Sequence, residues 1–300
     1  MRIGTRRSAL ALAQANHVAT LFEGAEIVPF VTRGDRGAAL EDKSRWVAEL
    51  EDALLAGEID VAVHSAKDLP GELAEGLALL GAPPRAALED VLCGADSLES
   101  LAPGTRIGTS SLRRMAQLHA AREDLEVVPV RGNVDTRLAK LSSAEDGLWA
   151  IVLARAGLQR LGRETEIGGV LDPARFVPAP GQGVLALQGR TDDAQTGAAV
   201  QTITDADAFA CLLAERAAAR ELGASCHTPF GASATPAGSE CLSLRTWVGL
   251  PDGSAWIADE LLGSFNDPEG LGRRVAERMQ AAGAESLLRQ AEEMAGVGSV

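Results

Sequence analysis

The sequence predicts an α/β protein: two similar α/β domains around a cleft, followed by a small C-terminal α+β domain. Strand and helix patterns alternate through residue 160, which is typical of parallel sheets with helical crossovers. The order of these elements repeats once, and the pattern changes after residue 204. We therefore expect a first domain at 1–83 plus 184–201, a second at 88–178 and a third at 204–300.

Composition excludes several classes of function. The 300 residues carry a net charge of −14, which argues against nucleic acid and anionic membranes as partners. The four cysteines include no Cys-x-x-Cys pair, so neither a zinc site nor a disulfide framework is indicated, and we expect reduced thiols and no metal. The apolar run after Arg7 is too short for a signal peptide, and no stretch approaches a transmembrane span, so we expect a cytoplasmic protein.

The first domain begins with five elements. Three short apolar runs predict strands. An Ala/Leu-rich stretch predicts the first helix, and a stretch with apolar residues on one face predicts the second. In order they are a strand at Arg2–Gly4, a helix at Ala9–Phe22, a strand at Glu26–Val31, a helix at Trp46–Ala56 and a strand at Ile59–Val63.

The repeat is visible at three places in the chain. Ile3-Gly4-Thr5 is matched by Ile107-Gly108-Thr109, and each tripeptide opens a helix through serine. Val31–Asp35 is loosely matched by Val130–Asn133, and Ile59–Val63 is matched by Trp149–Leu153. Each glycine indicates a close approach of the backbone to another group. Two helix N-termini facing one cleft favour anions, although ordinary N-capping explains these residues equally well.

Arginines favour the anion site. Several fall at predicted helix starts or strand ends of an otherwise acidic protein, where paired recognition of carboxylate or phosphate is expected. They are Arg6, Arg7, Arg113, Arg114, Arg131, Arg137 and Arg160.

One decapeptide, Val61–Pro70, combines an apolar strand with a polar end. Ligands bind at strand ends in open α/β sheets, and here a Lys67 ammonium adjoins an Asp68 carboxylate. This pair is a candidate for proton chemistry, although a strand followed by a solvated turn explains the decapeptide more simply when it is taken alone.

The chain then returns to the first domain. Pro178–Gly183 has two prolines followed by two glycines, a composition typical of a connection between domains. Val184–Leu187 is predicted to form one more strand of the first sheet. A helix at Asp205–Leu222 ends at Gly223, a natural C-cap. The remaining elements are strands at Leu242–Val248 and Ala255–Glu260 around a Pro251-Asp252-Gly253 turn, and helices at Leu271–Ala281 and Ser286–Met294.

Cys226 lies in a glycine-bracketed loop, Gly223–Gly231, beside His227. A loop cysteine next to histidine has the features of a reactive thiol. Nucleophilic hydrolysis by Cys226 with His227 or His64 is an alternative, but no oxyanion-hole signature accompanies it. The other cysteines, Cys93, Cys211 and Cys241, are expected to be buried and structural.

Taken together, these motifs resemble the porphobilinogen deaminase (hydroxymethylbilane synthase) family. They occur in the family's order and cover nearly the whole chain. The matching stretches are Ile3–Ser8, Val31–Asp35, His64–Pro70, Gly108–Arg114, Arg131–Leu138, Ala156–Leu161, Pro178–Gly183 and the Cys226 loop.

The resemblance implies a transferase that joins four porphobilinogen units, releases ammonia at each step and makes a linear tetrapyrrole. It implies a dipyrromethane cofactor bound covalently to Cys226, and a monomer. Asp68 would be catalytic. Cofactor binding would involve Ser65, Lys67, Thr109, Ser110, Ser111, Arg113 and Arg114. Substrate binding would involve Arg6, Ser8, Arg131, Arg137, Arg160 and Gln182.

The sequence departs from the family pattern at three places. The lid at 36–46 is short and lacks a Gly-Lys-Gly-Leu-Phe form, with Lys43 and Trp46 in place of its lysine and phenylalanine. Arg155 replaces a small or apolar residue, and the hinge at Arg85–Asp90 is atypical. These departures bear on lid closure and rate more than on the reaction type.

Two other functions fit part of the pattern. Two α/β domains around an anion cleft also describe periplasmic-binding-protein-like modules that bind ligands without catalysis, yet such modules have no use for a cysteine loop on a third domain. A homologue that keeps the cofactor and has lost efficient elongation is the other alternative.

Overall fold

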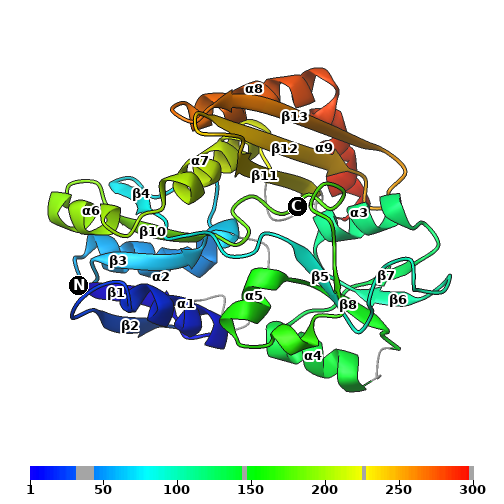
Figure 1. Cartoon of the computed structure of the whole chain (residues 1–300), viewed down its shortest axis with the longest axis horizontal. Helices are drawn as coiled ribbons and strands as arrows, with labels where there is room; N and C mark the ends of the chain where they lie inside the picture. Colours follow the sequence, from blue (N-terminus) through cyan, green and yellow to red (C-terminus); the bar gives the residue numbers. More distant parts are fainter. Residues whose placement is uncertain (32–43, 144–146, 225–227, 297–300) are drawn as a thin grey trace.

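The computed structural model describes residues 1–31, 44–143, 147–224 and 228–296. Figure 1 shows the first domain at the left, the second at the right and the C-terminal domain at the top. Each of the first two is built on a five-stranded sheet, and the third on a three-stranded sheet. The predicted fold class is confirmed.

The first sheet has the strand order β2-β1-β3-β10-β4. Its strands are β1 Arg2–Arg6, β2 Glu26–Phe30, β3 Val61–Ser65, β4 Leu77–Gly81 and β10 Leu185–Arg190. Helices α1 Ala9–Ala19, α2 Ser44–Leu55 and α6 Ala194–Gln201 belong to the same domain, and the short 3₁₀ helix η2 Ala66–Asp68 follows β3 directly. β1 pairs in parallel with β2 and β3, whereas β10 is antiparallel to β3 and β4, so the chain does return to this sheet as predicted.

The second sheet has the corresponding order, β7-β6-β8-β5-β9. Its strands are β5 Asp90–Cys93, β6 Arg106–Gly108, β7 Glu126–Val128, β8 Ala150–Ala154 and β9 Gly169–Val170. Its helices are α3 Leu112–Ala121, α4 Val134–Ser143 and α5 Arg155–Arg160, followed by the 3₁₀ helix η3 Glu164–Glu166. β6 pairs in parallel with β7 and β8, and β5 is antiparallel to β8 and β9.

The matching strand orders confirm the internal repeat. β1 and β6, which carry the two Ile-Gly-Thr tripeptides, occupy the same place in their sheets. Their glycines do lie at close approaches, but to packed side chains. A Cβ on Gly4 would meet Ile59, and one on Gly108 would meet Val130 and Ile151. These two glycines therefore serve the core of each domain.

The C-terminal domain packs helices on one face of an antiparallel sheet. Strands β11 Phe230–Pro236, β12 Cys241–Gly249 and β13 Trp256–Ser264 lie in that order, and the helices are α7 Ala206–Glu221, α8 Pro268–Ala281 and α9 Ala284–Met294. α7 begins at the Asp205 cap, which accepts from the Ala208 N–H, and is followed by Gly223 with a φ of 61°. Small alanines on α7 let α8 and the sheet approach it closely.

Element boundaries differ from the predictions by a few residues. The first helix ends at Ala19 because Thr20 bonds back to Asn16 and closes the last turn, and the strand before Asp68 runs over Val61–Ser65 instead of 59–63. The strands β4 and β5 were not predicted, since runs of five and four residues carry no distinctive period, and neither was β11, whose sequence is rich in small residues.

The predicted burial of the cysteines is confirmed at two positions. Cys93 and Cys211 are buried, and burial raises the pKa of the Cys93 thiol to about 11 and that of Cys211 to about 12. The prediction for Cys241 is wrong: it is only partly buried, because it opens β12 beside Leu242, which takes the inward position.

A buried ion pair joins all three domains. Glu215 on α7 is fully buried and accepts from Arg85 Nη1 at 2.7 Å, from the Gly181 N–H at 2.6 Å and from the Ala234 N–H at 2.7 Å. Arg85 also donates through Nε to the Gln182 carbonyl at 2.9 Å. Arg85 and Gly181 lie on the two connections between the first and second domains, so the C-terminal domain is fastened to both.

No helix within the described ranges is long and apolar enough to cross a membrane.

We expect Glu215→Gln to lower the free energy of unfolding by about 3–5 kcal/mol, because it leaves the buried Arg85 guanidinium without its counter-charge. Urea denaturation monitored by circular dichroism measures this change. Glu269→Gln is the matched control, because the Arg220–Glu269 pair is largely exposed, and a change under about 1 kcal/mol is expected there. Equal losses in the two variants would contradict this account.

Candidate active site

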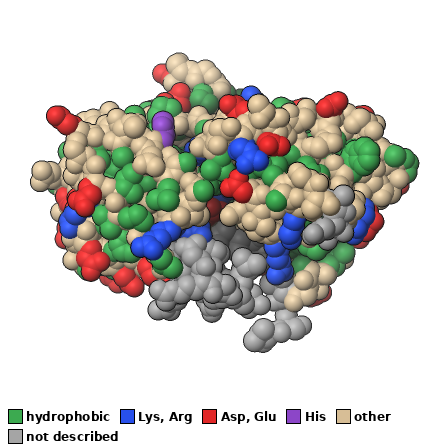
Figure 2. Space-filling view, turned by 90° about the horizontal axis from the view of Figure 1, so that it is seen from below, with side chains coloured by type: hydrophobic (Ala, Val, Ile, Leu, Met, Phe, Trp, Pro, Cys, Tyr) green, Lys and Arg blue, Asp and Glu red, His purple; other side chains and the backbone are tan. Residues whose placement is uncertain are grey.

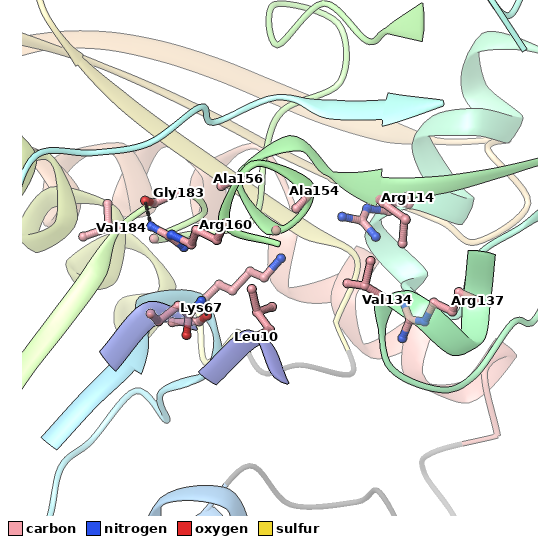
Figure 3. Close-up of a pocket in the computed structure, with 15 residues that line it drawn as sticks. Leu10, Lys67, Arg114, Val134, Arg137, Ala154, Ala156, Arg160, Gly183 and Val184 are labelled. Atoms are coloured by element: carbon pink, nitrogen blue, oxygen red, sulfur yellow. Dashed lines mark hydrogen bonds between the residues drawn. The ribbon is translucent and has the colours of Figure 1, made fainter. Parts of the chain in front are cut away.

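A pocket opens between the first and second domains (Figure 3). One wall comes from α1, β3 and η2, and the other from α3, α4 and α5. Lys67 extends into it from one side, and the guanidinium groups of Arg114 and Arg137 face it from the other. On the face shown in Figure 2, Lys and Arg side chains flank the hollowed middle of the molecule.

Four of the predicted cationic residues line this pocket together: Lys67, Arg114, Arg137 and Arg160. Arg160 donates to the Gly183 carbonyl at 2.7 Å, and burial lowers its pKa to about 10. Arg137 donates through Nε to the Gly132 carbonyl at 2.8 Å, and burial together with Arg114 lowers its pKa. The arginines remain charged at neutral pH, so the pocket attracts anions.

Burial also affects Lys67. Its Nζ donates to Gln182 Oε1 at 3.3 Å. Burial, followed by the charge of Arg114, lowers the pKa of the ammonium from 10.5 to about 8. Lys67 is therefore protonated at neutral pH but loses its charge in mildly alkaline solution.

Behind Lys67 lies Gln182, which is fully buried. Its Nε2 donates to the Leu88 carbonyl at 2.8 Å and to Asp90 Oδ1 at 2.9 Å. Gly181 and Gly183 make this placement possible: both have positive φ, and a Cβ on either would strike backbone of the first domain or of the hinge. The sequence predicted substrate contact for Gln182, whereas its amide here bonds to protein groups.

Asp90, the first residue of β5, anchors both predicted cofactor arginines. It accepts from Arg113 Nη2 at 2.8 Å and from Arg114 Nη2 at 2.7 Å, and all three side chains are buried. Burial alone would raise the pKa of Asp90, but the two guanidinium groups hold it well below its ordinary value. Arg113 and Arg114 also donate to the carbonyls of Val177 and Val152. Of the pair, only Arg114 lines the pocket.

The helix N-termini behave as capping predicts. Ser8 Oγ accepts from the Ala11 N–H, and Ser111 Oγ accepts from the Arg114 N–H. Thr109 is buried, and its Oγ1 accepts from the Ser111 N–H at 3.2 Å, whereas Ser110 is exposed. None of these four residues lines the pocket.

Asp68 ends η2 and is exposed. Its negative charge acts to raise the pKa of Lys67 beside it and of Arg137 on the opposite domain. The carboxylate thus lies within electrostatic reach of both walls. His64, by contrast, is buried and bonds through Nε2 to Gln188 Oε1 at 2.9 Å, and burial lowers its pKa to about 4, so it is neutral at ordinary pH.

Arg6 and Arg131 lie outside this pocket: Arg6 is partly buried on β1, and Arg131 is exposed just before α4. Arg155 forms a partly exposed ion pair with Glu89 at 3.5 Å. Cys226, His227 and lid residues 36–43 lie outside the described residues, as does the side chain of Trp46. Among the residues that are described, no group of His, Cys, Asp and Glu could hold a metal ion.

Two site residues, Gln14 and Asp90, were not predicted. Gln14 on α1 is buried, lines the pocket and donates to Ser65 Oγ at 2.7 Å. Its one local signal is a polar side chain between Ala13 and Ala15 in the apolar first half of the helix. Asp90 had no local signal, since its arginine partners lie 23 and 24 residues further along the chain.

Residues 1–198 match the family model "Porphobilinogen deaminase, dipyromethane cofactor binding domain", and residues 209–281 match "Porphobilinogen deaminase, C-terminal domain". This chain belongs to the porphobilinogen deaminase family.

Individual relatives agree over almost the full length. Porphobilinogen deaminase of Xanthomonas axonopodis pv. citri (strain 306) is 45% identical over 303 residues, covering 97% of this chain and 99% of the relative. That of Stenotrophomonas maltophilia (strain K279a) is 44% identical over 304 residues, covering 96% and 98%. Among solved structures, the chain is similar to the methionine binding protein MetQ at 15% identity and a TM-score of 0.39, covering 68% of this chain and 89% of that one.

The Lys67 environment predicts how the deaminase responds to pH. We expect kcat/KM for porphobilinogen to fall as pH increases through about 8, by up to tenfold per unit, because Lys67 loses the charge that pairs with carboxylates held in the pocket. Steady-state kinetics between pH 6.5 and 9.5 measures this. Lys67→Arg keeps its charge throughout, so its kcat/KM should stay level, and an unchanged alkaline fall in that variant would assign the effect to another group.

Proposed function

We propose that this protein is a porphobilinogen deaminase that condenses four porphobilinogen molecules stepwise, with release of ammonia, into the linear tetrapyrrole hydroxymethylbilane. The observation that carries the proposal is the cationic pocket between two domains of an acidic chain, with one exposed carboxylate beside it. Each pyrrole carries an acetate and a propionate, so the chain built on the enzyme gains two carboxylates per step. Converging arginines suit such a ligand.

The pocket also fits the family's dipyrromethane. Its four cationic side chains come from both walls, and Ser65 adds a hydroxyl that Gln14 orients. When attached through Cys226, the dipyrromethane supplies the primer to which pyrroles are added. Lys67, Ser65 and Arg114 would hold its carboxylates directly. Arg113, Thr109, Ser110 and Ser111 were predicted to do the same, and we propose that Arg113 contributes by fixing Asp90 and hence Arg114.

Incoming porphobilinogen would be bound by Arg137 and Arg160, which line the pocket on the second domain. Arg6, Ser8 and Arg131 lie outside this lining, and their part in substrate binding is proposed on the family resemblance alone. Gln182 would hold Lys67 in place instead of touching substrate, since its side chain is fully buried and its amide bonds to Lys67, Leu88 and Asp90.

Asp68 is the proposed catalytic residue. Loss of ammonia from bound porphobilinogen leaves a cationic azafulvene, and a carboxylate near the pyrrole N–H stabilises that charge. The same carboxylate can take the proton from the ring carbon at which the new carbon–carbon bond forms. The Asp68 charge interacts favourably with Lys67 beside it and with Arg137 on the opposite wall, since it acts to raise the pKa of both.

We also propose that the enzyme works as a monomer in the cytoplasm, without nucleic-acid or membrane partners. The acidic composition argues against nucleic-acid and membrane partners, and the free thiols of Cys93, Cys211 and Cys241 suit a reducing compartment. The monomer is proposed on the family resemblance alone. The curated relatives favour the enzyme over a non-catalytic anion-binding protein.

Asp68→Asn should leave a folded protein whose kcat falls at least 1000-fold, because the amide can neither stabilise the cation nor accept the proton. Turnover per folded molecule, with circular dichroism as the check on folding, measures this. Asp192→Asn, at an exposed aspartate distant from the pocket lining, is the control and should retain full activity. Turnover in Asp68→Asn within tenfold of the unaltered enzyme would remove Asp68 from the catalytic role.

Intact mass spectrometry tests the covalent cofactor. Protein from cells that make porphobilinogen should carry a dipyrrole adduct, and Cys226→Ser should lack it because serine offers no thiolate to form the thioether. Cys241→Ser, at a partly exposed cysteine of the C-terminal domain, is the control and should keep the adduct. An adduct that persists in Cys226→Ser would show attachment elsewhere.

A further inference from the structure

Arg216 on α7 points its charge at the segment that follows Asp68. Its Nη2 donates to the Pro70 carbonyl at 2.8 Å and to the Gly71 carbonyl at 2.9 Å, and only 7% of the residue is exposed. Burial lowers the pKa of Arg216 to about 10, so the guanidinium is charged at neutral pH. A buried cation that donates to two successive carbonyls holds a turn more firmly than a neutral donor does.

The backbone around Asp68 is held from both ends. On one side the Ala66 N–H donates to the Val184 carbonyl at 3.0 Å, which ties η2 to the connection between domains. On the other side Leu69 is buried against Leu212 of α7, one turn before Arg216. Pro70 and Gly71 then leave the core, and Gly71 is exposed. The Arg216 hydrogen bonds therefore hold the backbone at the point where it leaves the core for the surface.

α7 has a second connection to the site. The neighbouring Glu215 binds the Gly181 N–H, immediately before Gln182, which bonds to Lys67. The same helix leads, after Gly223, into the segment that contains Cys226. Figure 1 shows α7 rising from above β10 into the C-terminal domain. The helix α7 therefore bonds to the segment that holds Lys67, through Glu215, and to the turn that follows Asp68, through Arg216.

We propose that Arg216 is a positioning residue for Asp68: it fixes the turn after the catalytic carboxylate to the helix that carries the cofactor-cysteine domain. This inference assumes the proposed catalytic role of Asp68. Since misplacement of a catalytic group by about 1 Å can reduce the rate about 100-fold, loss of these hydrogen bonds should lower kcat more than it alters substrate binding.

The test compares three variants of the cofactor-loaded enzyme, with rates counted per loaded molecule by intact mass. Arg216→Met keeps the aliphatic stem in its apolar surroundings and removes both hydrogen bonds. We expect kcat to fall about 10- to 100-fold with KM within about threefold. Arg216→Lys keeps the charge but loses the planar guanidinium, and its kcat should lie between those of Arg216→Met and the unaltered enzyme. Arg220→Met is the matched control, because Arg220 lies one turn later in a partly exposed pair with Glu269, and its kcat should not change.

Hydrogen–deuterium exchange supplies a readout independent of turnover. The Leu69 amide, which donates to the Ala66 carbonyl at 3.2 Å, should exchange at least tenfold faster in Arg216→Met than in the Arg220 control. A folded Arg216→Met enzyme with kcat within twofold of the unaltered enzyme and unchanged exchange would overturn the proposal. If that variant does not fold, the same two criteria apply to Arg216→Lys.

The experiment also separates this inference from the proposed function. An inactive Asp68→Asn together with a fully active Arg216→Met refutes the positioning role alone. An active Asp68→Asn refutes the catalytic role of Asp68, whatever Arg216 does.

Discussion

A fully buried glutamate, Glu215, is the constraint on which the arrangement of the three domains depends. Burying a carboxylate is unfavourable unless every oxygen finds a donor, and Glu215 meets this condition with groups from three separate parts of the chain. Arg85 and Gly181 belong to the two interdomain connections, and Ala234 belongs to the C-terminal sheet. Moving any one of these segments would leave a buried charge without its partner.

Asp90 applies the same principle to the ligand side of the cleft. It holds two buried guanidinium groups and the Gln182 amide, and Gln182 in turn accepts from Lys67. Cations on both walls are thus linked through one carboxylate and one amide. The group keeps an excess of positive charge, because two arginines and a lysine surround a single aspartate. Such an excess of positive charge attracts a polycarboxylate ligand.

The sequence predicted correctly those features that depend on residues close together in the chain. The Ser8 and Ser111 caps, the Gly223 helix end and the alternation that defined the two sheets all depend on residues within a turn or a strand of one another. Motif resemblance added the family, which the comparisons confirmed. The sequence predicted ligand contact for Gln182 and Arg113 from the chemistry of their side chains. In the structure both side chains are buried and bonded to Asp90, which the sequence did not indicate.

The sequence by itself determined the repeated α/β pattern, the acidic surface with its gathered arginines, and the family to which the chain belongs. The pattern and the charge follow from short-range periodicity and composition, and the family follows from the resemblance of its motifs. Only the tertiary structure decided which arginines face the pocket, that Asp90 and Glu215 join distant segments, and that Arg216 contacts the turn beside Asp68 across 145 and 146 residues of chain. The physical reason is that burial and charge pairing are properties of the packed chain, and partners so far apart leave no trace in local spacing.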